Sequence, residues 1–263
     1  MLRHFFPSLA PYRNDAYWGL IFLALAVCGL LIYRRLTGLG EDRKRMGKLA
    51  LFLVLTAGPL GDLSSRAVNM FYAPSEEWSL QLWLEGFVTK GTHTYHAAMV
   101  LPILAWIAYI KLAKLDFWLI FDVIMLYFPL GHAIGRVGCL AAGCCFGEHV
   151  DWRVAGMHYD YKNPVPLYAV IGNTALYLVL SRIFRRSYEG SARTRQGGAV
   201  AGTYFVLYGL MRFCFELIRT EPVLVLGLTQ AQLVMCAFMA LGALLLVFGP
   251  RRRDAGAGSP VPT

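Results

Sequence analysis

Long runs of apolar residues alternate with short polar segments along almost the whole chain. An α-helix needs about 20 predominantly apolar residues to cross the hydrocarbon core of a bilayer, so we interpret these runs as membrane-spanning helices. The second run is short, and we expect its helix to extend through the region Val68–Tyr72. The seven predicted spans cover residues 16–33, 49–63, 95–113, 117–135, 166–183, 199–217 and 226–248.

The composition supports this interpretation. Of the 263 residues, 57% are hydrophobic and only 16% are charged, and the mean hydropathy is +0.50. A soluble domain of this length does not need so much apolar surface, whereas an integral membrane protein does. The sequence therefore predicts an all-α, polytopic membrane protein, with one membrane domain over residues 1–253 and a disordered tail at residues 254–263.

The basic residues predict the orientation. Sixteen of the 25 Lys and Arg residues fall in the loops on one side of the predicted spans, and nine fall on the other. Loops rich in Lys and Arg remain in the cytoplasm, so we expect the N-terminus outside and the C-terminus inside. The sixteen are Arg34, Arg35, Arg43, Lys44, Arg45, Lys48, Lys111, Lys114, Arg182, Arg185, Arg186, Arg193, Arg195, Arg251, Arg252 and Arg253.

The net charge of +9 is accordingly a topological signal that adds some attraction to anionic lipid. The basic residues are spread over separate loops, so no nucleic-acid partner is expected. The first helix lacks a basic segment followed by a small-residue cleavage site, and Arg34 and Arg35 follow it. We therefore expect a retained anchor and not a cleaved signal peptide.

One segment, residues 135–147, combines an arginine with four glycines and three cysteines at the outer end of the fourth span. An arginine at membrane depth is costly and usually marks a functional site. Here we expect Arg136 to bind a phospholipid phosphate, with Gly138 allowing close approach of the headgroup. His132, Arg136 and Cys139 share one face if the helix continues. The alternative is that Arg136 only reaches the headgroup layer at the interface.

The sixth span carries a polar stripe near its outer end. Tyr208, Arg212, Glu216 and Arg219 recur at intervals of three or four residues. Arg212 and Glu216 can pair along this face, which leaves Arg219 to bind an anion. The alternative is a structural ion pair between helices. At the start of the third span, also outside, His96 follows Tyr95, and an imidazole can exchange a proton near neutral pH.

Three of the six cysteines, Cys139, Cys144 and Cys145, lie on the predicted outer side. A disulfide between Cys139 and Cys144 is one interpretation, and free structural thiols are another. A metal site is a third, but the spacing matches no standard zinc pattern. We therefore predict no bound metal and no cofactor from the sequence.

These motifs, in this order, resemble those of the prolipoprotein diacylglyceryl transferases of bacterial inner membranes. The family has Tyr-His-Gly-Gly at its third helix, then Gly-Arg-x-Gly-Asn-Phe-x-Asn-x-Glu-x-x-Gly, and later Tyr-Gly-x-x-Arg-Phe-x-x-Glu-Phe-x-Arg. The matching residues are Tyr95, His96, Gly135, Arg136, Gly138, Gly147, Tyr208, Gly209, Arg212, Phe213, Glu216 and Arg219.

The resemblance implies a fold and an activity. The family moves diacylglycerol from phosphatidylglycerol to the cysteine thiol of a lipoprotein precursor, through a seven-span membrane protein with an outer N-terminus. It implies that Arg136 and Arg212 stabilise the phosphate, that His96 deprotonates the thiol and that Glu216 orients Arg212. The expected catalytic residues are His96, Arg136, Arg212 and Glu216. The expected substrate-binding residues are Tyr95, Gly138, Cys139, Cys144, Tyr208 and Arg219.

The chain departs from the family pattern at its signature. Cys139 and Ala142 replace the two asparagines, and Cys144 replaces the glutamate. Thiols do not reproduce the polar contacts of Asn and Glu. We therefore keep two alternatives: a divergent enzyme that uses the same lipid pocket for a different reaction involving thiols, and a lipid-binding membrane protein without catalysis.

Overall fold

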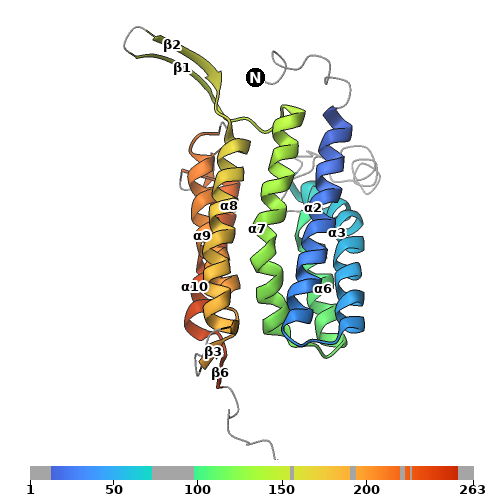
Figure 1. Cartoon of the computed structure of the whole chain (residues 1–263). Helices are drawn as coiled ribbons and strands as arrows, with labels where there is room; N and C mark the ends of the chain where they lie inside the picture. The colour runs from blue at the N-terminus through green and yellow to red at the C-terminus, as the bar shows by residue number, and fades with distance from the viewer. Residues whose placement is uncertain are drawn as a thin grey trace, which may run out of the picture. The chain divides into compact units, whose positions relative to one another are not determined.

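The structure is a computed structural model, and it describes residues 13–72, 98–154, 157–189, 194–219, 223–225 and 227–253. Within these residues the chain is mostly helical (Figure 1). The helices are α2 (Arg13–Gly38), α3 (Arg43–Tyr72), α6 (Val100–Leu112), α7 (Phe117–Ala142), α8 (Val165–Phe184), α9 (Ala199–Glu216) and α10 (Gln230–Phe248), and η2 (Arg185–Glu189) continues α8 as a π-helix.

Short antiparallel strand pairs occupy some of the connections. Strand β1 (His149–Val154) pairs with β2 (Met157–Lys162), so that His149 lies opposite Lys162. Strand β3 (Thr194–Gln196) pairs with β6 (Arg251–Arg253), and β4 (Val223–Val225) pairs with β5 (Leu228–Thr229). The three pairs form no common sheet, and β6 follows the last described helix.

Among the described helices, five are long and apolar enough to cross a membrane: α2, α3, α7, the α8–η2 segment and α10. The chain is therefore a polytopic helical membrane protein, as the apolar runs predicted. Helix α3 reaches Tyr72, which confirms the expected extension of the second run. Helix α6 has only 13 residues, and Arg212 and Glu216 make α9 less apolar. The count of seven spans and the outer N-terminus remain predictions.

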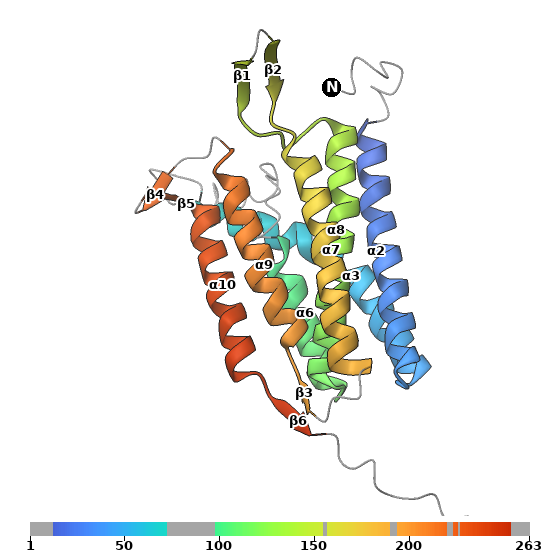
Figure 2. The same ribbon diagram turned by 60° about the vertical axis from the view of Figure 1, so that its left-hand side comes forward.

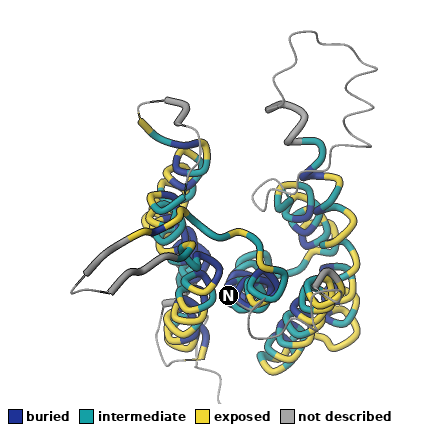
Figure 3. The backbone as a smooth tube through the Cα atoms, turned by 90° about the horizontal axis from the view of Figure 1, so that it is seen from above, coloured by how far each residue is buried: buried dark blue, intermediate teal, exposed yellow. Residues whose placement is uncertain are grey.

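The chain divides into two compact units, and we describe each by itself. The small unit comprises Gly29–Ile120, and the site unit comprises Met1–Cys28 together with Phe121–Thr263. The single domain predicted over residues 1–253 also remains a prediction. Seen along the helices in Figure 3, buried and exposed residues lie on different sides of individual helices.

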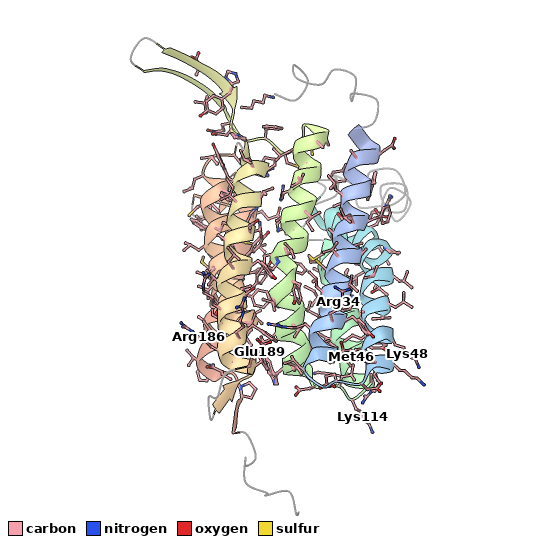
Figure 4. All side chains as sticks on the ribbon, in the orientation of Figure 1. Arg34, Met46, Lys48, Lys114, Arg186 and Glu189 are labelled. Carbon is pink, nitrogen blue, oxygen red and sulfur yellow. The ribbon has the colours of Figure 1, made fainter. Side chains whose placement is uncertain are left out.

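In the small unit, α3 and α6 pack antiparallel. Trp106 Nε1 donates a hydrogen bond to Thr56 Oγ1 at 3.0 Å, and the rings of Phe52 and Tyr109 stack at 4.5 Å. At one end of this unit the guanidinium of Arg45 donates to the carbonyl of Ala113, and Lys114 lies at the same end (Figure 4). Two of the basic loops that predicted the orientation therefore share one end of the small unit.

In the site unit, α8, α9 and α10 run side by side (Figures 1 and 2). Helices α9 and α10 pack especially closely at two glycines. A Cβ atom added at Gly242 would lie 2.6 Å from the carbonyl oxygen of Gly202, and one added at Gly209 would lie 2.7 Å from Met239. Small residues let helix backbones approach to contact, which is a common way of associating helices in membranes.

A buried carboxylate joins α7 to the beginning of α9. Asp122 is 0% exposed. It accepts hydrogen bonds from the Tyr188 hydroxyl at 2.7 Å and from the backbone amides of Gly198 and Ala201, each at 2.9 Å. The first amides of a helix have no partner within the helix and carry partial positive charge. Asp122 therefore caps α9 from a different helix.

The two ends of the site unit are formed by different segments. The pairing of β3 with β6 places Arg195 opposite Arg252, next to the start of α9 and the end of α10, and η2 lies at the same end (Figure 2). The C-terminal ends of α7 and α9 and the beginning of α8 lie at the other end. This second end holds Arg136 and Arg212, and it contains the site described next.

Candidate functional site

A small polar pocket opens among the ends of α7, α8 and α9, within the site unit. It encloses about 270 Å³ of space between atoms, which includes space open to the surroundings. The lining residues are His132, Arg136, Val165, Ala169, Asn173, Tyr208, Met211, Arg212, Phe215 and Arg219.

On α7, Arg136 and His132 lie one turn apart and face the pocket together. Arg136 Nε donates a hydrogen bond to His132 Nε2 at 3.0 Å, which fixes the direction of the guanidinium. Because α7 continues to Ala142, the shared face of His132, Arg136 and Cys139 that the spacing predicted does form. His132 itself is 9% exposed, so this pair lies at the edge of the buried region.

On α9, Arg212 and Glu216 form the expected ion pair. Glu216 is 4% exposed, and its second oxygen accepts a hydrogen bond from Thr229 Oγ1 at 3.2 Å. Thr229 is the N-cap residue of α10, in a capping box with Gln232. Glu216 thus contacts Arg212 on its own helix and Thr229 at the start of α10. These contacts hold Arg212 in position. The contribution of Thr229 was not predicted from the sequence, although Thr-x-x-Gln before an apolar run is the usual mark of a capping box.

Two buried polar atoms of the pocket have no hydrogen-bond partner among the described residues. They are the hydroxyl of Tyr208, on a side chain that is 1% exposed, and Oδ1 of Asn173, on a side chain that is 0% exposed. Buried polar groups are almost always paired, so these two atoms favour a polar ligand in the pocket. Asn173 was missed from the sequence; its signal is a lone amide within the apolar run 166–183.

The three outer cysteines converge at the end of α7. The amide of Cys144 donates to the carbonyl of Cys139 at 3.1 Å, and that of Gly143 donates to Leu140 at 3.2 Å. With Gly143 at φ 69°, this is a Schellman motif, in which the residues in the places of Cys139 and Cys144 come into contact. The Sγ atoms of Cys139, Cys144 and Cys145 all lie within 4.8 Å of one another. All six cysteines are free thiols in the structure.

The thiols in the loop after α7 differ in acidity. The pKa of Cys145 is lowered to about 5, chiefly because a hydrogen bond from Cys139 stabilises the thiolate, with smaller effects of Cys144 and of the Arg136 and Arg219 charges. The pKa of Cys144 is raised, first by burial and then by the nearby charge of Cys145. Of the two loop thiols, Cys145 is therefore the one that carries negative charge most readily.

The cysteine loop is tied to the end of α9. The amide of Glu148 donates to the carbonyl of Ile218 at 3.0 Å, and the amide of Gly147 donates to the carbonyl of Asn163 at 2.8 Å. A Cβ atom at Gly147 would clash with the carbonyl of Ile218. Glycine at position 147 is thus required for the loop to lie beside the segment that carries Arg219.

The remaining predicted site residues differ in where they lie. Gly138 does not line the pocket, because its α-carbon faces Tyr17 of α2, where an added Cβ would lie 3.3 Å from the ring. Its visible role is helix packing. Arg219 lines the pocket from just beyond the end of α9. Tyr95 and His96 lie outside the described residues, and all the predicted roles in binding and catalysis stay predictions.

The fold and the site define a multi-pass helical membrane protein with an arginine-lined polar pocket. The sequence model of the family described as prolipoprotein diacylglyceryl transferase matches residues 10–248. The chain belongs to that family, and it is an enzyme of the transferase type.

Individual relatives agree with this assignment. The chain is 27% identical over 240 residues to a phosphatidylglycerol–prolipoprotein diacylglyceryl transferase of Thermosynechococcus vestitus, covering 86% of this chain and 85% of the relative. It is 28% identical to the protein of the same name from Dehalococcoides mccartyi, with 90% of both chains covered. With that of Mannheimia succiniciproducens it shares 31% identity over 64% of each chain.

Proposed function

We propose that this protein transfers a diacylglyceryl group from phosphatidylglycerol to the cysteine thiol of a lipoprotein precursor. The names of the relatives give both substrates. The observation that carries the proposal is the pocket itself: Arg136, Arg212 and Arg219 line one cavity with the unpaired hydroxyl of Tyr208. An anionic phosphate is the group that such a cavity suits.

We place the reaction at the outer face of a bacterial inner membrane. Within the site unit, the pocket lies at the end opposite to Arg195 and Arg251–Arg253. Basic loops stay in the cytoplasm, so the pocket faces outward, where precursor proteins emerge. The seven spans and the outer N-terminus belong to the same proposal.

The proposed mechanism uses the arginines for both binding and catalysis. The thiolate sulfur of the acceptor attacks the glyceryl carbon bonded to the phosphate oxygen, and the carbon–oxygen bond breaks. The electron pair leaves with glycerol phosphate, whose added charge Arg136 and Arg212 stabilise. Glu216 keeps Arg212 in place through their ion pair. His96 is the proposed base for the acceptor proton.

The cysteines at the signature positions favour one variant of this function. Cys139 and Cys144 stand where the family pattern has Asn and Glu, so we propose that the activation of the acceptor thiol differs from that in the family reaction. A lipid-binding protein without turnover is the remaining alternative, and the same experiment separates it from an enzyme.

The test is complementation of a bacterial strain depleted of its own transferase, combined with a phosphatidylglycerol turnover assay on the purified protein. Arg136→Ala should abolish turnover, and Arg136→Lys should restore little of it, because an ammonium cannot make the two parallel hydrogen bonds of a guanidinium. Arg186→Ala, which changes an exposed arginine that does not line the pocket, is the control. Wild-type turnover by Arg136→Ala protein would exclude the proposed role, and lipid binding without turnover by the wild type would favour the non-catalytic alternative.

A further inference from the structure

We propose that Cys139, Cys144 and Cys145 bind a zinc ion, and that the open fourth position of this ion takes the thiol of the acceptor. The zinc site stands on the geometry of this chain alone, whereas the role of its fourth position rests on the proposed function. The spacing of the cysteines in the sequence matched no zinc motif and favoured free thiols. In the folded chain the three sulfur atoms nevertheless lie close together, which their spacing in the sequence did not show.

The geometry fits a three-sulfur metal site. Zinc–sulfur bonds are about 2.3 Å long, so three thiolates on one ion lie roughly 3.8–4.0 Å from one another. In the structure the three Sγ atoms lie within 4.8 Å of one another, and those of Cys144 and Cys145 are 3.6 Å apart. Only a small inward movement of the side chains is needed to complete the coordination. Zinc sites with three protein ligands leave the fourth position for water or substrate.

The cluster is not hydrophobic packing. Cysteines in a core are buried and inert, but here only Cys139 is buried, while Cys144 is intermediate and Cys145 is exposed. The Schellman motif fixes the first two sulfurs, and Cys145 then turns back with φ 62°. Positive φ is uncommon for a residue with a side chain. The backbone thus directs one buried thiol and two partly accessible ones toward one point.

The surrounding charge suits a zinc–thiolate complex. Three thiolates on Zn²⁺ carry a net charge of about −1, and the acceptor thiolate makes it about −2. The guanidinium of Arg136 lies within electrostatic range of all three sulfurs, and that of Arg219 lies within range of Cys145. These arginines favour the anionic complex and at the same time line the phosphate pocket. Metal and phosphate sites are therefore neighbours.

The chemistry balances without an oxidant or a further reactant. The acceptor thiol binds zinc and loses its proton to solvent or to a base, because coordination deprotonates a thiol outright. The zinc-bound sulfur then forms a bond to the glyceryl carbon as that carbon's bond to the phosphate oxygen breaks. Glycerol phosphate leaves with the electron pair, and the neutral thioether product, a weak ligand, dissociates. Zinc held at the signature positions thus assists the deprotonation of the acceptor thiol, for which His96 is the proposed base.

The first experiment measures metal binding on the purified, reduced full-length protein in detergent. We expect one equivalent of Zn²⁺ per chain. Co²⁺ in its place should give an intense sulfur-to-cobalt absorption, which reports thiolate coordination. Each of Cys139→Ser, Cys144→Ser and Cys145→Ser should weaken binding by more than the 10–100-fold typical of a residue that only supports a ligand. Cys214→Ser and Cys236→Ser, which change exposed cysteines elsewhere, should bind as the wild type does.

A second readout needs no variant. Zn²⁺ should protect Cys139, Cys144 and Cys145, and not Cys214, from alkylation, as mapped by mass spectrometry. Absence of both the cobalt absorption and the protection would overturn the metal site. A peptide with the acceptor cysteine should change the Co²⁺ spectrum, and its serine analogue should not; an unchanged spectrum would overturn the role of the fourth position.

Measurements of zinc binding and of lipid turnover on the same protein distinguish the zinc site from the proposed transferase function. Zinc binding without turnover of phosphatidylglycerol would leave the metal site intact and remove the proposed transferase activity. Turnover that is unchanged after zinc removal, and unchanged in the triple serine variant, would keep the transferase and exclude the zinc mechanism.

Discussion

At the scale of single residues, the pocket contains polar groups whose partners the described fold does not supply. The Tyr208 hydroxyl is fully surrounded by protein and has no hydrogen-bond partner among the described residues. A buried unpaired hydroxyl costs about 1–3 kcal/mol of folding free energy. Such a group is understandable if a bound phosphate accepts its hydrogen bond.

This gives a prediction for Tyr208→Phe. The free energy of unfolding should stay the same or increase, because the unpaired hydroxyl is removed. Lipid turnover should fall by roughly 2–13-fold, the effect of one lost hydrogen bond of about 0.5–1.5 kcal/mol. Thermal unfolding in detergent and the turnover assay measure the two effects. Tyr204→Phe, on the same helix but outside the pocket, should leave turnover unchanged; a matching loss there would show that the hydroxyl of Tyr208 has no special role.

Sequence reasoning located some of these residues and not others. Arg136, Arg212 and Glu216 could be found because charges are rare in apolar helices, and their spacing also predicted the shared face and the ion pair. Asn173 and Thr229 could not be given a place in the site, because their contacts depend on how α8 and α10 pack against α9. The direction of Gly138 toward α2 also depends on tertiary packing.

At the scale of elements, the close packing of α9 and α10 holds Arg212 in position. Gly242→Ala should force the two helices apart, because the added Cβ would lie 2.6 Å from the Gly202 carbonyl. Overpacking of this kind costs about 1–3 kcal/mol. We also expect turnover to fall, since Thr229 on α10 would move away from Glu216.

The control for this prediction is Gly19→Ala on the exposed face of α2, where nothing lies within 4 Å of the added Cβ. It should leave the unfolding temperature unchanged or raise it, because alanine favours a helix by about 1 kcal/mol over glycine. An unfolding temperature of Gly242→Ala equal to that of the wild type would mean that the two helices can separate without cost.

The elements themselves were largely predictable. Apolar runs predicted all seven described helices, and α7 ran past the expected residue 135 to Ala142 because the Schellman motif, and not the apolar pattern, ends it. The convergence of three cysteines depends on that later end. Sequence spacing alone could not show it, since a helix that ended at residue 135 would have directed Cys139 elsewhere.

At the scale of the whole molecule, the proposed orientation makes a labelling prediction. Cys145 lies at the pocket end of the site unit, and Ser187 in η2 lies at the opposite end, where β3 pairs with β6. After zinc removal, a membrane-impermeant maleimide should label Cys145 in spheroplasts, in which the outer face is accessible. A Ser187→Cys variant should be labelled at residue 187 only in inverted membrane vesicles. Labelling of both residues from the same side would contradict the proposed arrangement of the spans.

The capping of α9 by Asp122 has a consequence for how the protein is made. The carboxylate lies 76 residues before the amide of Gly198 that it binds. The ribosome therefore delivers α7 to the membrane, with its acid exposed, well before α9 exists. A carboxylate in a membrane-spanning segment has a high free-energy cost until it accepts hydrogen bonds. Assembly of the site unit must wait for α9, so a nascent chain that stops before residue 198 would carry an unfinished helix pair and be a ready substrate for membrane proteases.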